Sequence, residues 1–523
     1  MMTRINHIYL LPVAGIVALQ GCASKKAEQH KPLNIVYIMT DDHTQQMMSC
    51  YDKRFANTPN LDRIANEGVI FTNSFVCNSL SGPSRAVLLT GKHSHKNGYT
   101  DNSGGTIFNG EQQTVQQLLQ AGGYQTAMIG KWHLGGTPTH FDYWTILPAQ
   151  GDYYNPDFIT PEGKVHYEGY VTGIITDLSI DWLRNKRDTV RPFCMFVHHK
   201  AIHRNWMADT TDLELFEGQN YEMPENFRDD YWGRVAASQQ EMSIDKDMTL
   251  TYDLKMLDDE VDDHYRSLYI RENDTAGTYG RMNEAQKAAW NRHYQPIIDK
   301  FKKDKLTGKA LAEWKYQRYI SDYLKTVKSL DDHVGRLLDE LEKEGLLDNT
   351  LIIYASDQGF YMGEHGWFDK RFMYEESMRT PLVMRLPAGY ECRGEIGQMV
   401  QNIDYAPTFL EMAGLPVPAD MQGVSLLPLL KGETPENWRK SLYYHYYEYP
   451  AEHSVKRHYG VRTERYKLIR FYNDIDEWEL FDLKEDPHEM NNLYGKPGTE
   501  KITEEMKTEL KRLQEYYDDP CDK

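Results

Sequence analysis

The chain has 523 residues, with 59 lysines and arginines against 78 aspartates and glutamates, so its formal net charge is −19. Hydrophobic residues make up 40% and charged residues 26%, a composition typical of globular proteins that excludes a disordered or fibrous chain. The acidic balance argues against a partner that is a nucleic acid or an anionic membrane. A site for any anionic ligand would therefore have to be a local basic cluster.

The N-terminal segment has the pattern of an export signal. Arg4 supplies the positive start, and Ile8–Leu19 is an apolar run too short to cross a bilayer. The residues Leu-Gln-Gly-Cys that end at Cys22 resemble a bacterial lipoprotein box, which implies cleavage before this cysteine and lipidation of its thiol; an ordinary secretory signal is the alternative. We expect a periplasmic, membrane-anchored lipoprotein, with a signal peptide over 1–22 and a polar tether over 23–32.

Strand and helix patterns then alternate along the chain. Leu33–Met39 is a nearly continuous apolar run, as in a strand buried on both faces of a parallel sheet. A helix is predicted from Thr58-Pro59 to Gly68, followed by a strand over Val69–Phe75. Further elements are a helix over Thr114–Gln120 and strands over Gln125–Ile129, Phe193–Val197 and Leu351–Tyr354. This order predicts an α/β fold with a mainly parallel central sheet and helices on both faces.

The second half of the chain departs from this alternation twice. Residues 207–285 lack a clear period and are predicted to be an irregular acidic insertion. Ala310–Lys343 has apolar residues at helical spacing and predicts a long helix. We expect a catalytic domain over 33–435 and a small C-terminal α+β subdomain over 436–523, with an antiparallel sheet of strands Ser441–Tyr449, Tyr459–Thr463 and Tyr466–Phe471 and a helix over Thr503–Tyr516.

The most informative motif is Ser81-Gly82-Pro83-Ser84-Arg85, continuing to Gly91. Proline suits a helical first turn and glycine suits a C-cap, so Ser81 is predicted at a helix N-terminus, where free N–H groups favour an anion. Arg85 is one turn further along the same face. On its own, this pattern would also describe a common capping serine.

The motif resembles the signature of type I sulfatases, in the version with serine in place of the usual cysteine. Other segments resemble the family in the same order. They are Asp41-Asp42, Lys131 with His133, the His199–His203 segment, Asp357-Gln358, and Lys370. The resemblance covers essentially the whole mature chain and implies an alkaline-phosphatase-like fold for the large domain.

The resemblance implies that a maturation enzyme oxidises Ser81 to formylglycine. A serine hydroxyl is a weak nucleophile, whereas hydrated formylglycine offers two hydroxyls. One would attack sulfur, and the second would later expel sulfate by re-forming the aldehyde. By the same resemblance, Arg85 orients this diol, His133 assists it, and His203 protonates the leaving alcohol.

The resemblance also implies one calcium ion. Its ligands would be Asp41, Asp42, Asp357 and Gln358, completed by the modified Ser81; such an all-oxygen set is typical of calcium. Lys131 and Lys370 would bind the sulfate oxygens.

The substrate is less well indicated than the reaction. Residues 359–376 and 444–468 resemble bacterial N-acetylglucosamine-6-sulfatases, which implies exo-acting removal of the 6-O-sulfate of N-acetylglucosamine during breakdown of heparan sulfate. Arg371, His445, Glu448, His453 and His458 are the candidates for binding the sugar or a neighbouring acid group. Iduronate, galactose or mucin-glycan sulfates remain alternatives.

Two further classes remain open. A phosphodiesterase or phosphonate hydrolase of the same superfamily would use an unmodified serine or threonine, commonly with two zinc ions. A non-catalytic lipoprotein could bind sulfated glycans with Ser81 left unoxidised.

Overall fold

The computed structural model describes residues 32–519 except 104, 259 and 262–278. The predicted signal peptide, Cys22 and nearly all of the predicted tether lie outside the described residues. Residues 32–523 form one unit by their contacts. Among the described residues, no helix combines the length and the apolar character that crossing a bilayer requires.

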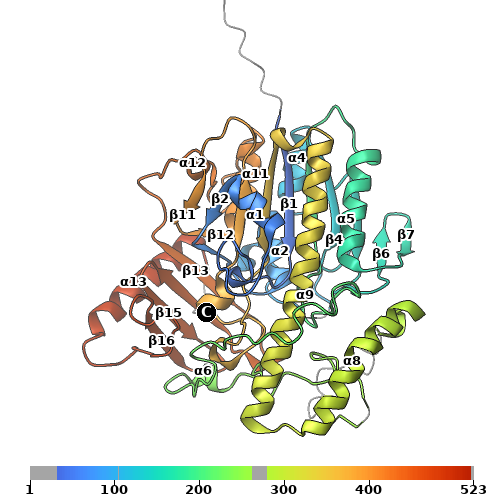
Figure 1. The fold of residues 1–523 in the computed structure, drawn as a ribbon. Helices are drawn as coiled ribbons and strands as arrows, with labels where there is room; N and C mark the ends of the chain where they lie inside the picture. Colours follow the sequence, from blue (N-terminus) through green and yellow to red (C-terminus); the bar gives the residue numbers. More distant parts are fainter. Residues whose placement is uncertain (1–31, 104, 259, 262–278, 520–523) are drawn as a thin grey trace, which may run out of the picture. The chain divides into compact units, whose positions relative to one another are not determined.

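A ten-stranded sheet forms the centre of the molecule (Figure 1). The five middle strands are mutually parallel, whereas β10, β6 and β7 pair antiparallel at the sides. The strand order is β11 (Gly394–Ile396), β2 (Gly68–Phe71), β10 (Leu382–Arg385), β9 (Thr350–Ser356), β1 (Asn34–Thr40), β8 (Phe193–His198), β4 (Gln125–Lys131), β5 (Tyr143–Leu147), β6 (Asp157–Thr160) and β7 (Gly163–His166). The prediction of a mainly parallel α/β sheet is confirmed.

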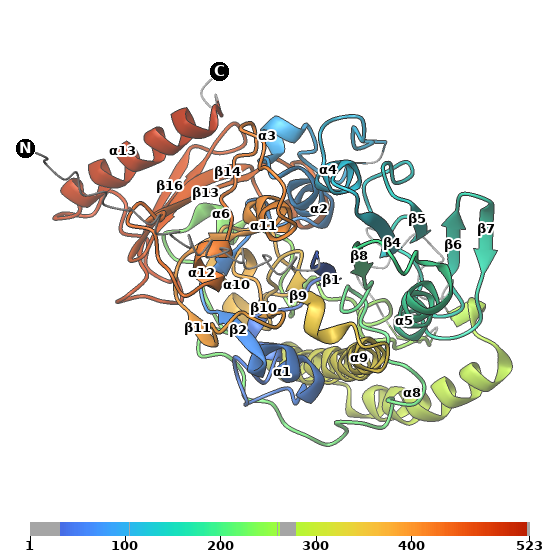
Figure 2. The ribbon, with the colours of Figure 1, turned by 90° about the horizontal axis from the view of Figure 1, so that it is seen from above.

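Helices cover both faces of this sheet (Figure 2). All seven residues of β1 are buried, and they alternate between two hydrophobic cores. Val36 and Ile38 face the core shared with α1 (Pro59–Asn66), α5 (Val171–Asp181) and α9 (Gly308–Lys343). Tyr37 and its neighbours in the strand face the core shared with α2 (Ser81–Thr90), α4 (Val115–Ala121) and α11 (Tyr405–Met412). Burial on both faces explains the unbroken apolar run in the sequence.

The predicted strand over Val69–Phe75 is two short strands. β2 ends at Phe71, and β3 (Ser74–Phe75) leaves the large sheet to pair with β12 (Val400–Gln401). The long helix is confirmed as α9, and it is preceded by α8 (Glu284–Asp304), which the sequence analysis missed. α8 has an internal proline and a polar composition, so its apolar period is weak.

The insertion over 207–285 is irregular where it is described, with the short helix α6 (Val235–Ser238). The other short helices are α3 (Ser94–Asn97), α10 (Glu375–Met378) and α12 (Leu427–Leu430), with a π-helical turn at Trp182–Lys186 and 3₁₀ turns at Gln45–Met47, Leu347–Asn349, Glu364–Gly366, Asn402–Asp404 and Glu452–Ser454.

The C-terminal part has its own antiparallel sheet, as predicted. Its order is β13 (Ser441–Tyr446), β14 (His458–Thr463), β15 (Tyr466–Phe471) and β16 (Glu477–Asp482). The helix α13 (Glu500–Tyr517) packs on this sheet, and Leu510 and Leu513 share a core with Val461 and Leu468. Figure 2 shows this layer beside the large sheet.

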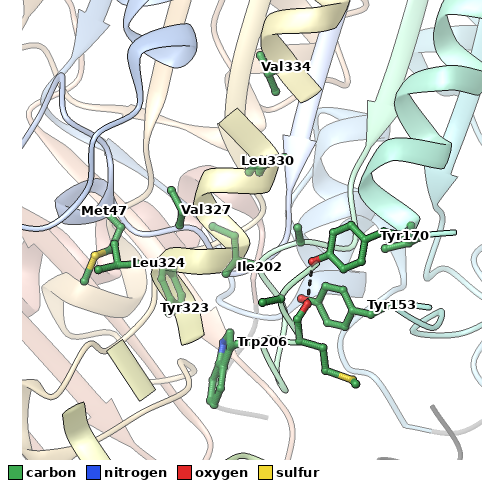
Figure 3. Close-up of a cluster of buried hydrophobic side chains, with 14 of the residues drawn as sticks. Met47, Tyr153, Tyr170, Ile202, Trp206, Tyr323, Leu324, Val327, Leu330 and Val334 are labelled. Carbon is green, nitrogen blue, oxygen red and sulfur yellow. Dashed lines mark hydrogen bonds between the residues drawn. The ribbon is translucent and has the colours of Figure 1, made fainter. Parts of the chain in front are cut away.

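The buried face of α9 supports the loop that follows β8 (Figure 3). Tyr323, Leu324 and Val327 lie on the helix face that meets Ile202 in this loop. The Tyr323 hydroxyl donates to the main-chain oxygen of Asp42, 2.6 Å away, and accepts from the Thr44 amide at 3.2 Å. Hydrophobic packing of one helix therefore fixes two loops at the end of the sheet.

Candidate active site

The carboxyl ends of four neighbouring parallel strands bring the predicted site residues together. Asp41 follows β1, Asp357 follows β9, Lys131 ends β4 and His198 ends β8. The strand ends are level, because Thr40 pairs with Ser356 and Met39 pairs with His198. Ligands of open α/β sheets bind at this edge.

Ser81 is the first residue of α2, as predicted, and this helix ends in a left-handed cap at Gly91. The Ser81 hydroxyl donates to Asp41 Oδ1, 2.9 Å away. A Cβ atom at Gly82 would lie 2.5 Å from Asn102 Oδ1 and 3.2 Å from the His133 main-chain oxygen, so a larger side chain there would have to displace its neighbours. The helix N-terminus therefore presents the Ser81 hydroxyl to the acidic strand ends.

Three buried carboxylates and one amide surround this hydroxyl. The Asp42 amide donates to Asp357 Oδ1 at 3.3 Å. Gln358 Nε2 lies 2.5 Å from Asp42 Oδ1, 3.5 Å from Asp41 Oδ1 and 3.3 Å from Ser81 Oγ. The structure thus brings together all five predicted metal ligands.

Three cations balance these carboxylates. Arg85 Nη2 donates to Asp357 Oδ2 at 2.9 Å, and its Nη1 donates to the Lys131 main-chain oxygen at 2.7 Å. Lys131 Nζ forms an ion pair with Asp41, and Lys370 Nζ lies 2.6 Å and 2.8 Å from the two carboxylate oxygens of Asp42.

The carboxylates titrate very differently. Burial raises the pKa of Asp42 to about 7, although Lys370 opposes the shift and Asp41 adds to it. Burial and the charge of Asp41 raise the pKa of Asp357 to about 6. Burial would also raise the pKa of Asp41, but Lys131 and other cations hold it well below its usual range. The charged form of two of the three carboxyl groups is therefore destabilised, and a bound cation would stabilise it.

The residues present fit a hard divalent cation. Gln358 Oε1 is buried and has no hydrogen-bond partner among the described residues. An amide oxygen and three carboxylates are the donors that calcium and magnesium prefer. Asp41, Asp42 and His203 also place one possible ligand atom each within 4.8 Å of one another.

The two predicted catalytic histidines lie at the same edge. His203 Nδ1 lies 2.6 Å from the Arg204 main-chain oxygen, so Nδ1 carries a proton and Nε2 is left for chemistry. His203 Nε2 is 4.0 Å from Asp42 Oδ2. His133 Nε2 lies 3.1 Å from Gln150 Nε2. Burial, reinforced by the positive charge of Lys131, holds the pKa of both imidazoles well below its usual value.

A cavity of about 370 Å³ opens over Ser81, His133, His203 and Lys370. Arg371 also lines it, as expected for a residue that binds the sugar. Glu448, also a candidate for sugar binding, lines it too. The remaining lining residues were not among the predicted site residues: Asn102, Gln150, Arg204, Tyr252, Asp369 and Glu452.

Some of these residues had a sequence signal. Asp369 flanks Lys370, Arg204 follows His203, and Gln150 follows a strand end, although the pattern of β5 is too short to be recognised in the sequence. Tyr252 belongs to the irregular insertion and had no signal.

His445, His453 and His458 are not among the residues that line the cavity. His453 Nδ1 lies 2.6 Å from the main-chain oxygen of Glu241 in the insertion. His445 is hydrogen-bonded at 2.7 Å to Asp519 and at 2.7 Å to Tyr472. His458 Nε2 accepts from the Met373 amide at 3.0 Å. The ring nitrogens of His445 and His458 are used inside the C-terminal sheet and its contact with the 370–374 loop, and Nδ1 of His453 is used at the insertion, so we do not carry these histidines forward as sugar-binding residues.

Comparison with known proteins agrees with this geometry. The sulfatase family matches residues 33–415, and the C-terminal region of N-sulphoglucosamine sulphohydrolase matches residues 363–516. An N-acetylglucosamine-6-O-sulfatase of Bacteroides thetaiotaomicron is 52% identical over 518 residues, covering 98% of this chain and 91% of that protein. The human N-acetylglucosamine-6-sulfatase is 28% identical over 466 residues, covering 84% and 71%.

Solved structures give the same result. One of them, a complex with its substrate D-glucosamine-2-N,6-O-disulfate, has a TM-score of 0.89 and 52% identity, covering 94% of this chain and 99% of that one. The strand-end site, the serine at a helix N-terminus and these matches together place the chain in the sulfatase family.

Proposed function

We propose that this sulfatase is an exo-acting enzyme that hydrolyses the 6-O-sulfate ester of terminal N-acetylglucosamine during breakdown of glycosaminoglycans such as heparan sulfate. The single observation that carries the proposal is 52% identity, over nearly the whole chain, to a relative named for that activity. The substrate named for the similar solved structure is likewise a glucosamine with a 6-O-sulfate.

The size of the cavity and the fixed position of Arg371 support an exo-acting enzyme. Its volume of about 370 Å³ is near the lower end of the range for ligand pockets, ~300–1,000 Å³, so it suits one sugar ring with its sulfate. Asp369, Arg371 and Glu448 lie at one wall and offer acceptors and donors for hydroxyl groups. Arg371 is held by Asp369 at 3.1 Å and by Glu448 at 2.9 Å, so its guanidinium is positioned before a ligand arrives.

The nucleophile in this proposal is Ser81 after oxidation to formylglycine by a maturation enzyme. Its hydrate supplies a hydroxyl to attack sulfur and a second one to release sulfate. In the unmodified chain the Ser81 hydroxyl already donates to Asp41, and Arg85 lies one turn further along the helix. These two residues would orient the modified side chain.

Two lysines would stabilise the negative charge of the sulfate oxygens. Lys131 and Lys370 pair with Asp41 and Asp42, so both ammonium groups are held in place; Lys370 lines the cavity, whereas Lys131 is fully buried and is not among its lining residues. Sulfate oxygens placed there would receive donors without reorganisation.

His203 would protonate the leaving sugar oxygen. Its Nδ1 is fixed by the Arg204 carbonyl, so only Nε2 can transfer a proton to a ligand. The imidazole is neutral in the ligand-free site, and a bound sulfate would favour its charged form because opposite charges stabilise each other. Substrate binding would thus favour the protonated form of His203, which is the form that acts as the acid.

We assign one calcium ion to Asp41, Asp42, Asp357, Gln358 and residue 81. When bound, it would supply Lewis-acid stabilisation of a sulfate oxygen and of the nucleophile. The raised carboxylate pKa values support this assignment, and so does the Gln358 amide, which lies against Asp42 and Ser81 and would offer its oxygen to the cation with the amide group turned over.

We further propose that the protein is exported and anchored in the periplasm through lipid on Cys22. The support is the sequence pattern alone. Export would put the enzyme where sulfated oligosaccharides arrive from outside the cell.

The fold does not separate sulfatases from related hydrolases, because a phosphonate monoester hydrolase of Agrobacterium radiobacter shares it at 19% identity with a TM-score of 0.65. The deciding experiment is a panel of sulfated mono- and disaccharides offered to matured enzyme, with phosphate diesters and phosphonate esters as controls. We expect sulfate release from 6-O-sulfated N-acetylglucosamine at a non-reducing end. Preference for a 2-O-sulfated uronate or for a phosphonate ester would refute the proposal.

A further inference from the structure

Gln150 lies between two residues of the site and bonds to both. Its Oε1 accepts a hydrogen bond from Lys131 Nζ, and its Nε2 lies 3.1 Å from His133 Nε2. The same residue lines the cavity. Neither the sulfatase signature motif nor the predicted site included it.

The chemistry of the two partners fixes the orientation of this amide. A lysine ammonium can only donate, so the amide oxygen of Gln150 must face Lys131. The amide NH₂ group must then face His133, and it can only donate. His133 Nε2 is therefore the acceptor, which leaves the ring proton on Nδ1. A protonated Nε2 would set two donors against each other.

The loop that carries Gln150 is itself held in place. Ala149 and Gly151 both have positive φ, 47° and 69°, and the Gly151 amide donates to the Pro148 oxygen at 2.8 Å. The Gln150 main-chain oxygen accepts from Lys200 Nζ at 3.1 Å. This lysine is buried and lies 4.8 Å from the centre of the Tyr153 ring.

The opposite nitrogen of His133, Nδ1, is buried and has no protein partner among the described residues. His133 lines the cavity, and a buried donor without a partner is costly unless a ligand satisfies it.

We infer that Gln150 is a positioning residue. Its amide accepts a hydrogen bond from Lys131 and donates one to His133, and it thereby holds this histidine as the neutral tautomer protonated on Nδ1. In that state His133 has no free lone pair. It can donate a hydrogen bond to an oxygen of the sulfate or of the nucleophile, but it cannot take up a proton while the Gln150 contact holds. The inference deepens the proposed function and rests on it for its catalytic consequence, but not for the tautomer.

The test is the ¹⁵N spectrum of the full chain labelled with ¹⁵N-histidine, with His133 assigned by comparison with His133→Gln. In the wild type we expect a pyridine-type Nε2 and a pyrrole-type Nδ1. In Gln150→Glu the carboxylate can only accept hydrogen bonds. It would still accept from Lys131, but it can bond to His133 only if His133 Nε2 carries a proton. We expect Nε2 to become pyrrole-type, with kcat on the sulfated sugar reduced about 10- to 100-fold and KM nearly unchanged.

Two further variants separate positioning from folding. Gln150→Met keeps the shape but loses both bonds, so it should lose the tautomer preference at an unchanged melting temperature. Gln239→Glu adds the same charge at an exposed site and should leave spectrum and kinetics unaltered. A pyrrole-type Nε2 in the wild type, or an unchanged spectrum in Gln150→Glu, would overturn the inference. Failure of the sugar panel would instead reject the proposed substrate, because the spectrum needs no substrate.

Discussion

The carboxyl edge of the large sheet and the C-terminal sheet are both rich in histidines and charged side chains, but they use them differently. At the carboxyl edge, Asp42 and Asp357 have raised pKa values, and the Gln358 amide oxygen is unpaired. In the C-terminal sheet, His445 and His458 have both ring nitrogens bonded. The two histidines therefore support the sheet and are not left for a ligand, although the C-terminal sheet also buries a carboxyl, that of Glu479, whose pKa burial raises to about 8.

The two regions meet at the 370–374 loop. This loop carries Lys370 and Arg371 into the site, while His458 accepts from its Met373 amide and Lys467 donates to the Met373 oxygen at 2.7 Å. The C-terminal sheet therefore acts on the site by holding a loop.

The largest effect should come from His203→Ala. Loss of the proton donor for the leaving oxygen should lower kcat on a sulfated sugar by about 10²- to 10⁴-fold, with a modest change in KM. The loss should shrink with an aryl sulfate, whose leaving group needs no proton. Steady-state kinetics on both substrates check this. An equal loss on both would show that His203 binds sulfate instead.

Arg371→Gln should raise KM for the sulfated sugar by about 10-fold, because a charged, preordered hydrogen-bond donor is lost. For a small aryl sulfate, which does not reach this wall, kcat/KM should stay within about twofold. Arg465→Gln is the matched control, since Arg465 forms an exposed pair with Asp482 in the C-terminal sheet. Equal changes for both substrates would remove Arg371 from sugar recognition.

Cation binding should weaken in acid. In the cation-free protein the pKa of Asp42 is raised to about 7 and that of Asp357 to about 6, so below these values a proton must leave before a cation binds. Calcium affinity should be flat above pH 7, fall up to tenfold per unit between pH 7 and 6, and fall more steeply below. Calorimetric titration at several pH values checks this. An affinity independent of pH from 8 to 5 would contradict the assigned ligands.

The free energy of unfolding of the cation-free protein should also depend on pH, but in the opposite direction to the calcium affinity. At Asp42 and Asp357 the cation-free fold binds more protons than the unfolded chain, so the contribution of these two groups to stability should fall as pH rises from about 4 towards 7, whereas the lowered pKa of Asp41 acts in the opposite direction. Added calcium should reverse this trend, because it binds the folded state. Thermal melts with calcium or with a chelator measure both curves.

The smallest effect on turnover should come from His445→Phe in the C-terminal sheet. The variant loses hydrogen bonds to Asp519 and Tyr472, which should cost about 1–3 kcal/mol in the free energy of unfolding. kcat/KM should stay within about twofold. Urea unfolding and kinetics measured on one preparation make the comparison, and a large kinetic loss at unchanged stability would return His445 to the site.

The strand-end residues were predicted from the resemblance to sulfatase motifs, and their position at the ends of buried strands supported that prediction. Asp41, Lys131 and Asp357 each follow or end a strand that is buried on both faces, and parallel strands place such residues at one edge. Ser81 at the start of α2 followed from proline and glycine at helix-end positions. Strong periodicity likewise predicted α9.

The rest depends on contacts between distant segments. Asn102, Gln150 and Tyr252 reach the cavity from three separate loops, and no local pattern encodes their meeting. His445 and His458 were selected for their residue type within an aromatic stretch. Composition could not reveal that their ring nitrogens are bonded inside the sheet.

The most direct test of the central claim is peptide mass spectrometry across Cys77–Arg85, combined with a turnover assay on the same preparation. We expect activity to rise in proportion to the fraction of Ser81 converted to the aldehyde. A host that oxidises only the cysteine motif should yield folded, inactive protein, and Ser81→Cys in that host should restore turnover. Many turnovers of a 6-O-sulfated sugar by protein with intact serine and no detectable aldehyde would contradict the account.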